Sequence, residues 1–278
     1  MMRWFFVAGL IVMLTLPVAA FDFASPPGVG AGKSVQLSAP GAGELLNLPI
    51  GASSAGWWRV ETGLSRSYDL RDLDLVFATG AYRRRNLTLA IGFSQFGHSD
   101  LYSERLLKGS ISLNRNSLAL GASGSFMVLG FGGGYTSLNA VAFSFAAGWH
   151  SAKWHAAGAI DDLNSPTFAK HDRARKPRFS LHGEFVGKSY SLLGHVTLQK
   201  DQDAQFGAGQ RIAVKQSSAF VWGFTTSPFT FGGGIELGLG SSHITYSANY
   251  HPTLGLTQLI SVSYGSPVSQ KRVDDGLR

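Results

Sequence analysis

Residues 56–264 alternate, one residue at a time, between apolar side chains and small or polar ones. Around Ile91, for example, Leu89 and Phe93 share its parity, and Ala90 has the other. A period of two places the two sets on opposite faces of a β-strand. In a water-soluble sandwich the apolar set would face the core, whereas in a membrane barrel it would face lipid. The alternation alone predicts an all-β chain and does not choose between these two folds.

Turn residues divide this region into about 14 strands, and an even number is typical of single-chain bacterial barrels. Most of the strands are close to the roughly 9 to 11 residues that cross a membrane at a tilt. The predicted strands span residues 56–66, 70–80, 84–96, 105–113, 116–127, 139–149, 151–160, 178–186, 189–199, 206–215, 218–226, 229–239, 242–251 and 256–264.

The connections between the predicted strands alternate in length. Short turns follow the even-numbered strands, and the extended connections all follow odd-numbered ones. Outer-membrane barrels have short periplasmic turns and longer outer loops, and a soluble sandwich has no reason to sort its loops in this way. The sequence therefore predicts a transmembrane antiparallel up-and-down β-barrel in a Gram-negative outer membrane. The extended connections are residues 97–104, 128–138, 161–177 and 200–205.

Three segments lie outside this predicted barrel of residues 56–264. Residues 1–20 hold one early cation, an apolar run and then small residues, which predicts a cleaved signal peptide. No later run reaches the roughly 18 consecutive apolar residues of a membrane-spanning helix. Residues 21–55 are rich in Gly, Ala, Ser and Pro, and we expect either a periplasmic arm or a plug that enters the lumen. Residues 265–278 form a polar tail.

The composition indicates which partners to expect. The chain has no cysteine, which is compatible with export, and its formal net charge of +7 favours acidic partners. It has no basic helix, zinc spacing or RNA-binding motif, so we expect no nucleic acid. We expect outer-membrane lipid and lipopolysaccharide as neighbours instead. The extended connection 161–177 would offer cations to lipopolysaccharide phosphates, or would be an ordinary solvated loop; its candidates are Lys170, Arg173, Arg175 and Lys176.

The aromatic residues Trp149, Trp154 and Tyr264 lie toward predicted strand ends, as do several others. Amphipathic rings at such positions form the interfacial girdle of a membrane barrel. Ordinary packing, or an aromatic platform for a ligand, is the alternative for any one of them.

The face opposite to the apolar one is expected to line the lumen. Charges near the middle of the lipid face would cost a few kcal/mol each, so their gathering on the other face supports this assignment. Many of the remaining lumen residues are Gly, Ala, Ser and Thr, which leave room for a narrow passage. The polar candidates for the lumen are Arg59, Glu61, Asp72, Asp74, Arg84, His182, Glu184, His195, Arg211, Lys215, Glu236 and His243.

One group among these candidates could in principle do chemistry. His182, Glu184 and His195 lie on adjacent predicted strands with Ser180 nearby. A Ser with a His and a carboxylate could provide the nucleophile, base and orienting group of a lipid hydrolase. Charged residues that pair with each other to fill a barrel interior are the better explanation, and the His and Glu spacing does not match a metal site. We therefore expect no enzyme activity, no metal and no cofactor.

Three short stretches carry a resemblance to a known family. They are Asp-Leu-Asn-Ser-Pro-Thr at residues 162–167, Phe-Gly-Ala-Gly-Gln at 206–210 and Tyr-His-Pro-Thr-Leu-Gly-Leu-Thr at 250–257. With them, the second half resembles the PorV/PorQ-like branch of the FadL-type outer-membrane proteins. The resemblance implies a barrel of 14 strands, in agreement with the strand count above.

The resemblance also implies two functions. FadL-type proteins carry hydrophobic molecules through the outer membrane, whereas PorV-like proteins serve type IX secretion and surface attachment. The chain departs from both, because we find no Asn-Pro-Ala stretch near the N-terminus, its loops are short, and it does not end on an aromatic residue. Two hypotheses remain. The first is a channel or carrier for small, hydrophobic molecules, and the second is a non-transporting barrel whose loops or N-terminal arm dock secretion-system proteins.

Overall fold

The computed structural model describes residues 34–38, 40–50, 57–98, 101–133, 135–169, 174–215 and 218–266. Apart from one short helix and two 3-10 turns, the elements in these ranges are β-strands. The strands are β1 Trp57–Arg66, β2 Asp74–Arg84, β3 Leu87–His98, β4 Tyr102–Arg115, β5 Leu118–Phe131, β6 Leu138–His150, β7 Trp154–Asp161, β8 Arg178–Val186, β9 Tyr190–Gln199, β10 Gln205–Lys215, β11 Ser218–Thr225, β12 Thr230–Leu239, β13 Ser242–His251 and β14 Gly255–Gly265.

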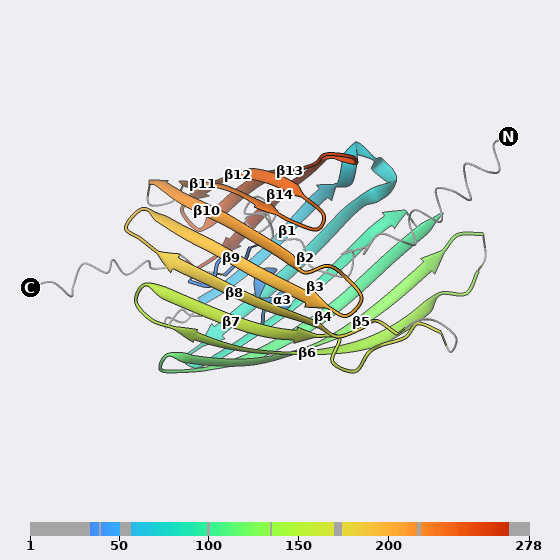
Figure 1. Ribbon diagram of the computed structural model, residues 1–278, viewed down its shortest axis with the longest axis horizontal. Helices are drawn as coiled ribbons and strands as arrows, with labels where there is room; N and C mark the ends of the chain where they lie inside the picture. The colour runs from blue at the N-terminus through green and yellow to red at the C-terminus, as the bar shows by residue number, and fades with distance from the viewer. Residues whose placement is uncertain are drawn as a thin grey trace, which may run out of the picture.

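The 14 strands form one closed antiparallel barrel, in which each strand pairs with its neighbours in sequence (Figure 1). The barrel closes where β1 pairs with β14, with Val60 opposite Tyr264 and Leu64 opposite Ile260. Closure leaves no sheet edge to be solvated, which a structure within lipid requires. The predicted fold class and number of strands are confirmed.

The two ends of the barrel differ in the length of their connections. At one end, on the left in Figure 1, β2 to β13 are joined in pairs by turns such as residues 85–86 and 116–117. At the other end the connections vary in length from residues 99–101 to residues 162–177. The connection between β1 and β2 at this end contains the 3-10 turns η2 Ser67–Asp69 and η3 Arg71–Leu73. We call these two ends the turn end and the loop end. All six connections at the turn end have two or three residues, as predicted, and the longer connections, including 132–137 and 162–177, lie at the loop end. The predicted extended connection 97–104 is wrong, because β3 and β4 continue into it and leave only residues 99–101.

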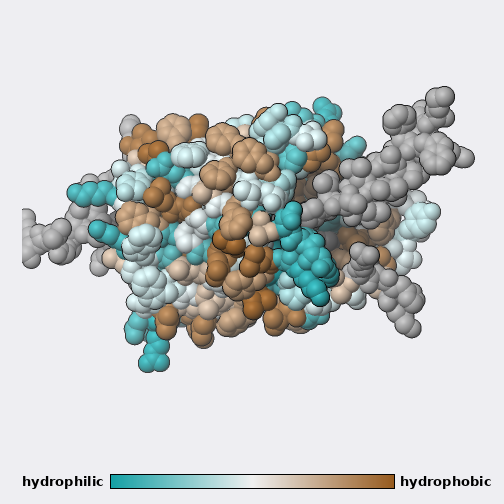
Figure 2. Space-filling view, viewed as in Figure 1, coloured by the Kyte–Doolittle hydropathy of each residue, from teal (hydrophilic) through white to brown (hydrophobic). Residues whose placement is uncertain are grey.

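The outer surface of the barrel is apolar. Ile91, Ile111 and Phe143 are each about half exposed, and they face outward on three different strands. Brown apolar side chains accordingly cover much of the middle of the face that Figure 2 shows. A water-soluble monomer rarely exposes so much contiguous apolar surface, whereas a membrane barrel turns it toward lipid. The strand parity is therefore that of an outer-membrane barrel.

Several strand limits differ from those predicted. The second strand begins at Asp74 instead of residue 70, because residues 71–73 form η3, and it continues to Arg84. β4 and β5 extend further toward the loop end than predicted, which leaves only residues 99–101 between β3 and β4. These extensions carry residues such as Glu104, which a pattern search for apolar alternation does not recognise. Within the described ranges, no helix is long and apolar enough to span a membrane.

Candidate functional site

The described part of the N-terminal segment lies in the lumen. Residues 34–38 and 40–50, which we call the plug, run inside the barrel and include the short helix α3, Glu44–Asn47 (Figure 1). Ser38 of the plug donates two hydrogen bonds to Glu184 of β8, from its backbone N–H to Oε2 at 2.6 Å and from its hydroxyl to Oε1 at 2.8 Å. Ser34 Oγ lies 3.1 Å from Nδ1 of His195 on β9. The plug is thus held by polar bonds to the β8–β9 wall.

Apolar contacts hold the plug at a second place. Leu45 and Leu46 of α3 are fully buried in a cluster with inward-facing side chains of the barrel wall. The hydroxyl of Ser110 on β4 donates a hydrogen bond to the backbone oxygen of Leu45 at 3.0 Å, and this satisfies a polar group of the helix. The inward-facing wall residues of the cluster include Phe77, Leu106, Met127 and Leu259.

Toward the turn end, the plug lies directly against the wall. A Cβ atom at Gly121 of β5 would lie 1.7 Å from the backbone oxygen of Pro49, and one at Gly148 of β6 would lie 2.5 Å from Cδ1 of Ile50. Glycine is the residue that permits such an approach. Next to these glycines, Leu37, Leu48 and Ile50 pack on small wall side chains, namely Ala119, Ala146, Ala157 and Ala159.

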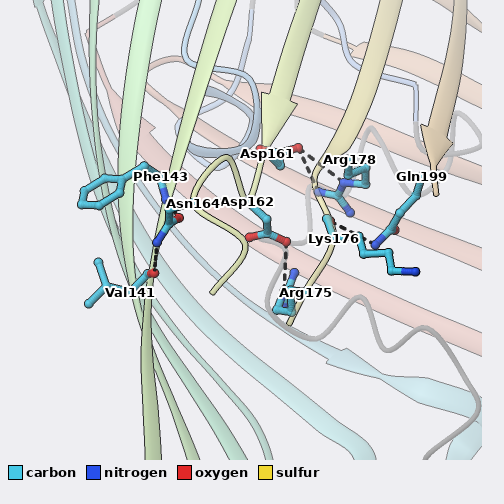
Figure 3. A network of polar contacts seen from close by, with 9 residues as sticks. All are labelled: Val141, Phe143, Asp161, Asp162, Asn164, Arg175, Lys176, Arg178 and Gln199. Carbon is cyan, nitrogen blue, oxygen red and sulfur yellow. Dashed lines mark hydrogen bonds and ion pairs between the residues drawn. The ribbon is translucent and has the colours of Figure 1, made fainter. Parts of the chain in front are cut away.

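The connection between β7 and β8, which we call the mouth loop (residues 162–177), lies at the loop end. Two ion pairs hold it beside the lumen, Asp161 with Arg178 at 3.1 Å and Asp162 with Arg175 at 2.9 Å (Figure 3). Phe168 of the loop packs against the same apolar cluster that surrounds Leu45. The mouth loop and the plug therefore meet one continuous cluster from two sides.

The beginning of the mouth loop also supplies hydrogen bonds to the barrel wall. β7 ends at Asp161, whereas its neighbour β6 continues further toward the loop end. Asn164 forms hydrogen bonds with this part of β6, where a longer β7 would otherwise pair. Its carboxamide accepts a hydrogen bond from the N–H of Phe143 at 3.0 Å and donates one to the oxygen of Val141 at 2.8 Å (Figure 3). Both partners are strand residues with side chains that face lipid, where an unsatisfied backbone group costs several kcal/mol.

We therefore expect Asn164→Ala to lower the free energy of unfolding by about 2–4 kcal/mol, because two backbone groups lose their partner. Guanidinium-induced unfolding of the refolded barrel in lipid vesicles measures this change. Asn139→Ala is the matched control, since Asn139 is an exposed residue of the same strand β6. Equal stability of the two variants would contradict the role of Asn164 in the wall.

Two small cavities lie among the described residues of these elements. One is lined at the loop end by Lys108, Asp161 and Arg175 among others, and the other is lined at the turn end by Leu37, Ile50 and His155 among others. Each has a volume of about 10 Å³, which is room for roughly one water molecule. In this conformation, the plug and the mouth loop leave little free space beside these residues.

Most of the predicted lumen residues share the inward parity of their strands. His182 and His195 stack with their ring centroids 5.7 Å apart, and Arg211 forms an ion pair with Glu236 at 2.7 Å. Glu184 is bound by the plug, as described above. The side chain of Lys215 lies outside the described part of the chain. The inward-parity residues are Arg59, Glu61, His182, Glu184, His195, Arg211, Glu236 and His243.

Three of the predicted lumen residues lie elsewhere. Asp72 is exposed in η3, and Asp74 pairs with Arg66 at 3.0 Å on the outward parity of β1 and β2. Arg84 is exposed and faces outward, while its neighbour Arg83 is buried and faces inward. The prediction started the third strand at Arg84, but that residue still belongs to β2, so the parity is reversed. All three lie at or next to an end of β2, where an outward charge reaches water or headgroups.

The lumen also contains charged residues that the prediction missed. Glu104 and Lys108 of β4 are buried, as are His155 and Asp161 of β7. Lys108 could have been found, because it has the polar parity within the predicted strand 105–113. Glu104 and Asp161 each lie one residue outside a predicted strand, so no parity was assigned to them.

The cations proposed for lipopolysaccharide have partners within the chain where they are described. Arg175 pairs with Asp162, and Lys176 pairs with Asp201 of the β9–β10 connection. Lys170 and Arg173 lie outside the described residues. Contact with lipopolysaccharide stays a prediction for all four.

The arrangement does not resemble a catalytic site. Glu184, which would orient the base of a hydrolase, is already occupied by two bonds from Ser38, and His182 stacks on a second imidazole. Among the described residues, no group of three or more His, Asp or Glu side chains could hold a metal ion.

A closed barrel with an apolar outer face and an internal segment defines the class of the protein: it is a bacterial outer-membrane β-barrel.

Comparison with solved structures supports this class. No protein-family model and no curated protein matches the chain. The structure is similar to that of the Pseudomonas putida toluene transporter TodX, with a TM-score of 0.65 and 8% sequence identity over 88% of this chain and 98% of that one. It is also similar to the Acinetobacter baumannii outer membrane protein Omp33, with a TM-score of 0.51 and 11% identity over 76% of this chain and 99% of that one. At such identities the likeness shows the fold alone.

Proposed function

We propose that this chain is an outer-membrane channel for small hydrophobic molecules, and that the plug closes it in the conformation described. The observation that carries the proposal is the apolar surface of the lumen wall. Phe77, Leu106, Met127 and Leu259 face inward and are at most 2% exposed, and they share one buried apolar cluster with Leu45 and Leu46 of the plug. The interior of a porin for polar solutes is polar and filled with water instead.

The physical argument concerns what could replace the plug. Movement of Leu45 and Leu46 away from the wall would expose apolar surface to water, at about 25 cal/mol for each Å². A hydrophobic solute in the vacated space would cover the same surface and recover that free energy, whereas an ion or sugar would not. The wall therefore favours apolar molecules as occupants of the lumen.

The position of the mouth loop is consistent with a route into this region. Phe168 extends the apolar cluster toward the loop end, and Leu48 and Ile50 meet small apolar side chains toward the turn end. A solute that enters at the loop end would pass charged side chains such as Lys108 and Asp161 before it reaches this apolar cluster.

The comparison with TodX supports the proposal without establishing it. That protein is described as a toluene transporter and as a monoaromatic hydrocarbon channel, and one variant matches 88% of this chain with a TM-score of 0.64. The resemblance of residues 162–167 and 250–257 to FadL-type proteins agrees with the same class of substrate. A nearer relationship to the PorV/PorQ-like branch stays a hypothesis.

A second candidate function is a non-transporting barrel that acts in protein secretion or surface assembly. The tight packing of the plug favours it, since neither of the two cavities beside the plug and the mouth loop holds more than about one water molecule. In that case the plug would be permanent, and docking through the loops or the N-terminal arm would be the function. The two candidates differ in whether the plug has to move.

A disulfide lock on the plug tests this difference. The chain has no cysteine, so Leu45→Cys with Ser110→Cys introduces one pair at the position where these residues are hydrogen-bonded. Expression in Gram-negative cells that lack other hydrocarbon channels is expected to raise the initial rate of toluene uptake several-fold. Oxidation of the pair should return uptake to background, and a reductant should restore it.

The single variant Leu45→Cys controls for the loss of the leucine side chain. Its rate of toluene uptake should change neither on oxidation nor on reduction. Uptake that equals that of cells without the protein would contradict the channel. Uptake that is unchanged by the lock would show that transport does not require movement of the plug.

A further inference from the structure

The hairpin turns at the turn end are cationic and contain no acidic residue. Neither the six turns nor the residues on either side of them include Asp or Glu. Five exposed cations, which we call the turn-side cations, lie in or next to four successive hairpins from β2 to β9. They are Arg84, Arg85, Arg115, Lys153 and Lys188.

The loop end has a different charge arrangement. Its cations alternate with carboxylates, and four of them form ion pairs, including Arg66 with Asp74 and Arg178 with Asp161. None of the turn-side cations forms an ion pair or a side-chain hydrogen bond with the described part of the chain. The excess positive charge of the described barrel is therefore concentrated at the turn end, where these five side chains have no charged partner among the described residues.

The turn-side cations lie at the border of the lipid-facing surface. Tyr82 precedes Arg84 by two residues on the same outward face, and Trp154 follows Lys153 directly; both aromatic side chains are more than half exposed. Exposed Trp and Tyr rings mark the level of the lipid headgroups. Long cationic side chains beside them extend from apolar surface toward that level.

From this placement, we propose that the turn-side cations bind the phosphate groups of anionic phospholipids in the leaflet at the turn end. Turns of this kind face the periplasm in outer-membrane barrels, so the leaflet is the inner one. A guanidinium or ammonium group forms charge-assisted hydrogen bonds with phosphate oxygens. The occupant is inferred to be lipid because the cations follow the headgroup level around four hairpins of two or three residues, which offer little projecting surface to a protein.

Lipid retention by the purified barrel tests the proposal. The refolded protein is mixed in detergent with equal amounts of phosphatidylglycerol and phosphatidylcholine of the same acyl chains, and native mass spectrometry measures the lipids that remain bound. We expect phosphatidylglycerol to be retained in preference. Arg84→Gln, Arg115→Gln and Lys188→Gln combined should lower the ratio of the two retained lipids roughly tenfold.

The matched control is Arg71→Gln, Arg105→Gln and Lys200→Gln combined, since these three cations are exposed at or near the loop end. It should leave the ratio unchanged. Migration on a gel before and after heating establishes that each variant forms the barrel, and the three turn-side single variants are used if the triple variant does not fold.

Two results would overturn the proposal. One is an equal effect of the two triple variants, which would mean that only net charge matters. The other is a wild-type protein without preference for phosphatidylglycerol, which would favour an acidic periplasmic protein as the partner of these residues. Neither result bears on hydrophobic transport, which is tested separately through the plug.

Discussion

Glu184→Ala is expected to release the plug from the β8–β9 wall. The Glu184 carboxylate is 1% exposed and accepts two hydrogen bonds from Ser38, at 2.6 and 2.8 Å. Hydrogen bonds to a charged group contribute about 1.5–3 kcal/mol each. The loss of both should raise the population of the displaced plug by roughly a hundredfold or more.

A single reporter cysteine measures this release. Ala42→Cys places a thiol at a fully buried position. It is the only thiol in the variant, because the native sequence has no cysteine. The rate of maleimide labelling in the refolded barrel should rise with the population of the displaced plug. Glu236→Ala is the control, because Glu236 is also a lumen carboxylate but pairs with Arg211 of the wall. Similar labelling rates in both variants would mean that Ser38 and Glu184 do not hold the plug.

Gly121→Leu is expected to turn a closed barrel into a conducting one. Even a Cβ atom at this position would lie 1.7 Å from the backbone oxygen of Pro49, and 2.8 Å from its carbonyl carbon. Neither the strand backbone nor the plug backbone can shift without a loss of stability, and overpacking of this kind costs about 1–3 kcal/mol or more. We expect the plug to leave this part of the wall, so that ions cross the lumen.

Planar-bilayer recordings measure the effect. Stable conductance steps are expected for Gly121→Leu, with little or no conductance for the unmodified barrel. Gly109→Leu is the control, because Gly109 faces outward on β4 and the nearest atom to its Cβ position is 4.0 Å away. If the Gly121 variant forms a heat-modifiable barrel and stays silent, the plug does not block ions at Pro49.

The sequence predicts the barrel wall well because the relevant signal is local. Leu89 and Ile91 face lipid and Ala90 faces the lumen as a direct result of the period of a strand. Glu61 and His195 have the inward parity that the same rule predicts. It failed for Arg84, because the prediction assigned that residue to the third strand instead of β2. Asp72 and Asp74 have the outward parity of β2, whose odd-numbered residues, such as Leu75, face the lumen. The rule that the apolar set faces lipid therefore selected the wrong face of this strand.

The candidate site was predicted less completely. Glu184 was selected as a lumen residue, but its partner Ser38 is 146 positions away in the sequence, and no local pattern connects the two. Lys108 has the correct parity and could have been added. The role of Asn164 depends on the early end of β7, which the sequence does not indicate.

The sequence by itself determined the all-β class, the number of strands, and the end of the barrel on which each loop lies. Period and connection length are properties of neighbouring residues, so they can be read without coordinates. Only the tertiary structure decided what fills the lumen. The contacts of Leu45 with Phe77 and Leu106, and of Pro49 with Gly121, join separate segments of the chain, and their free energy depends on close packing that forms only after the barrel has closed.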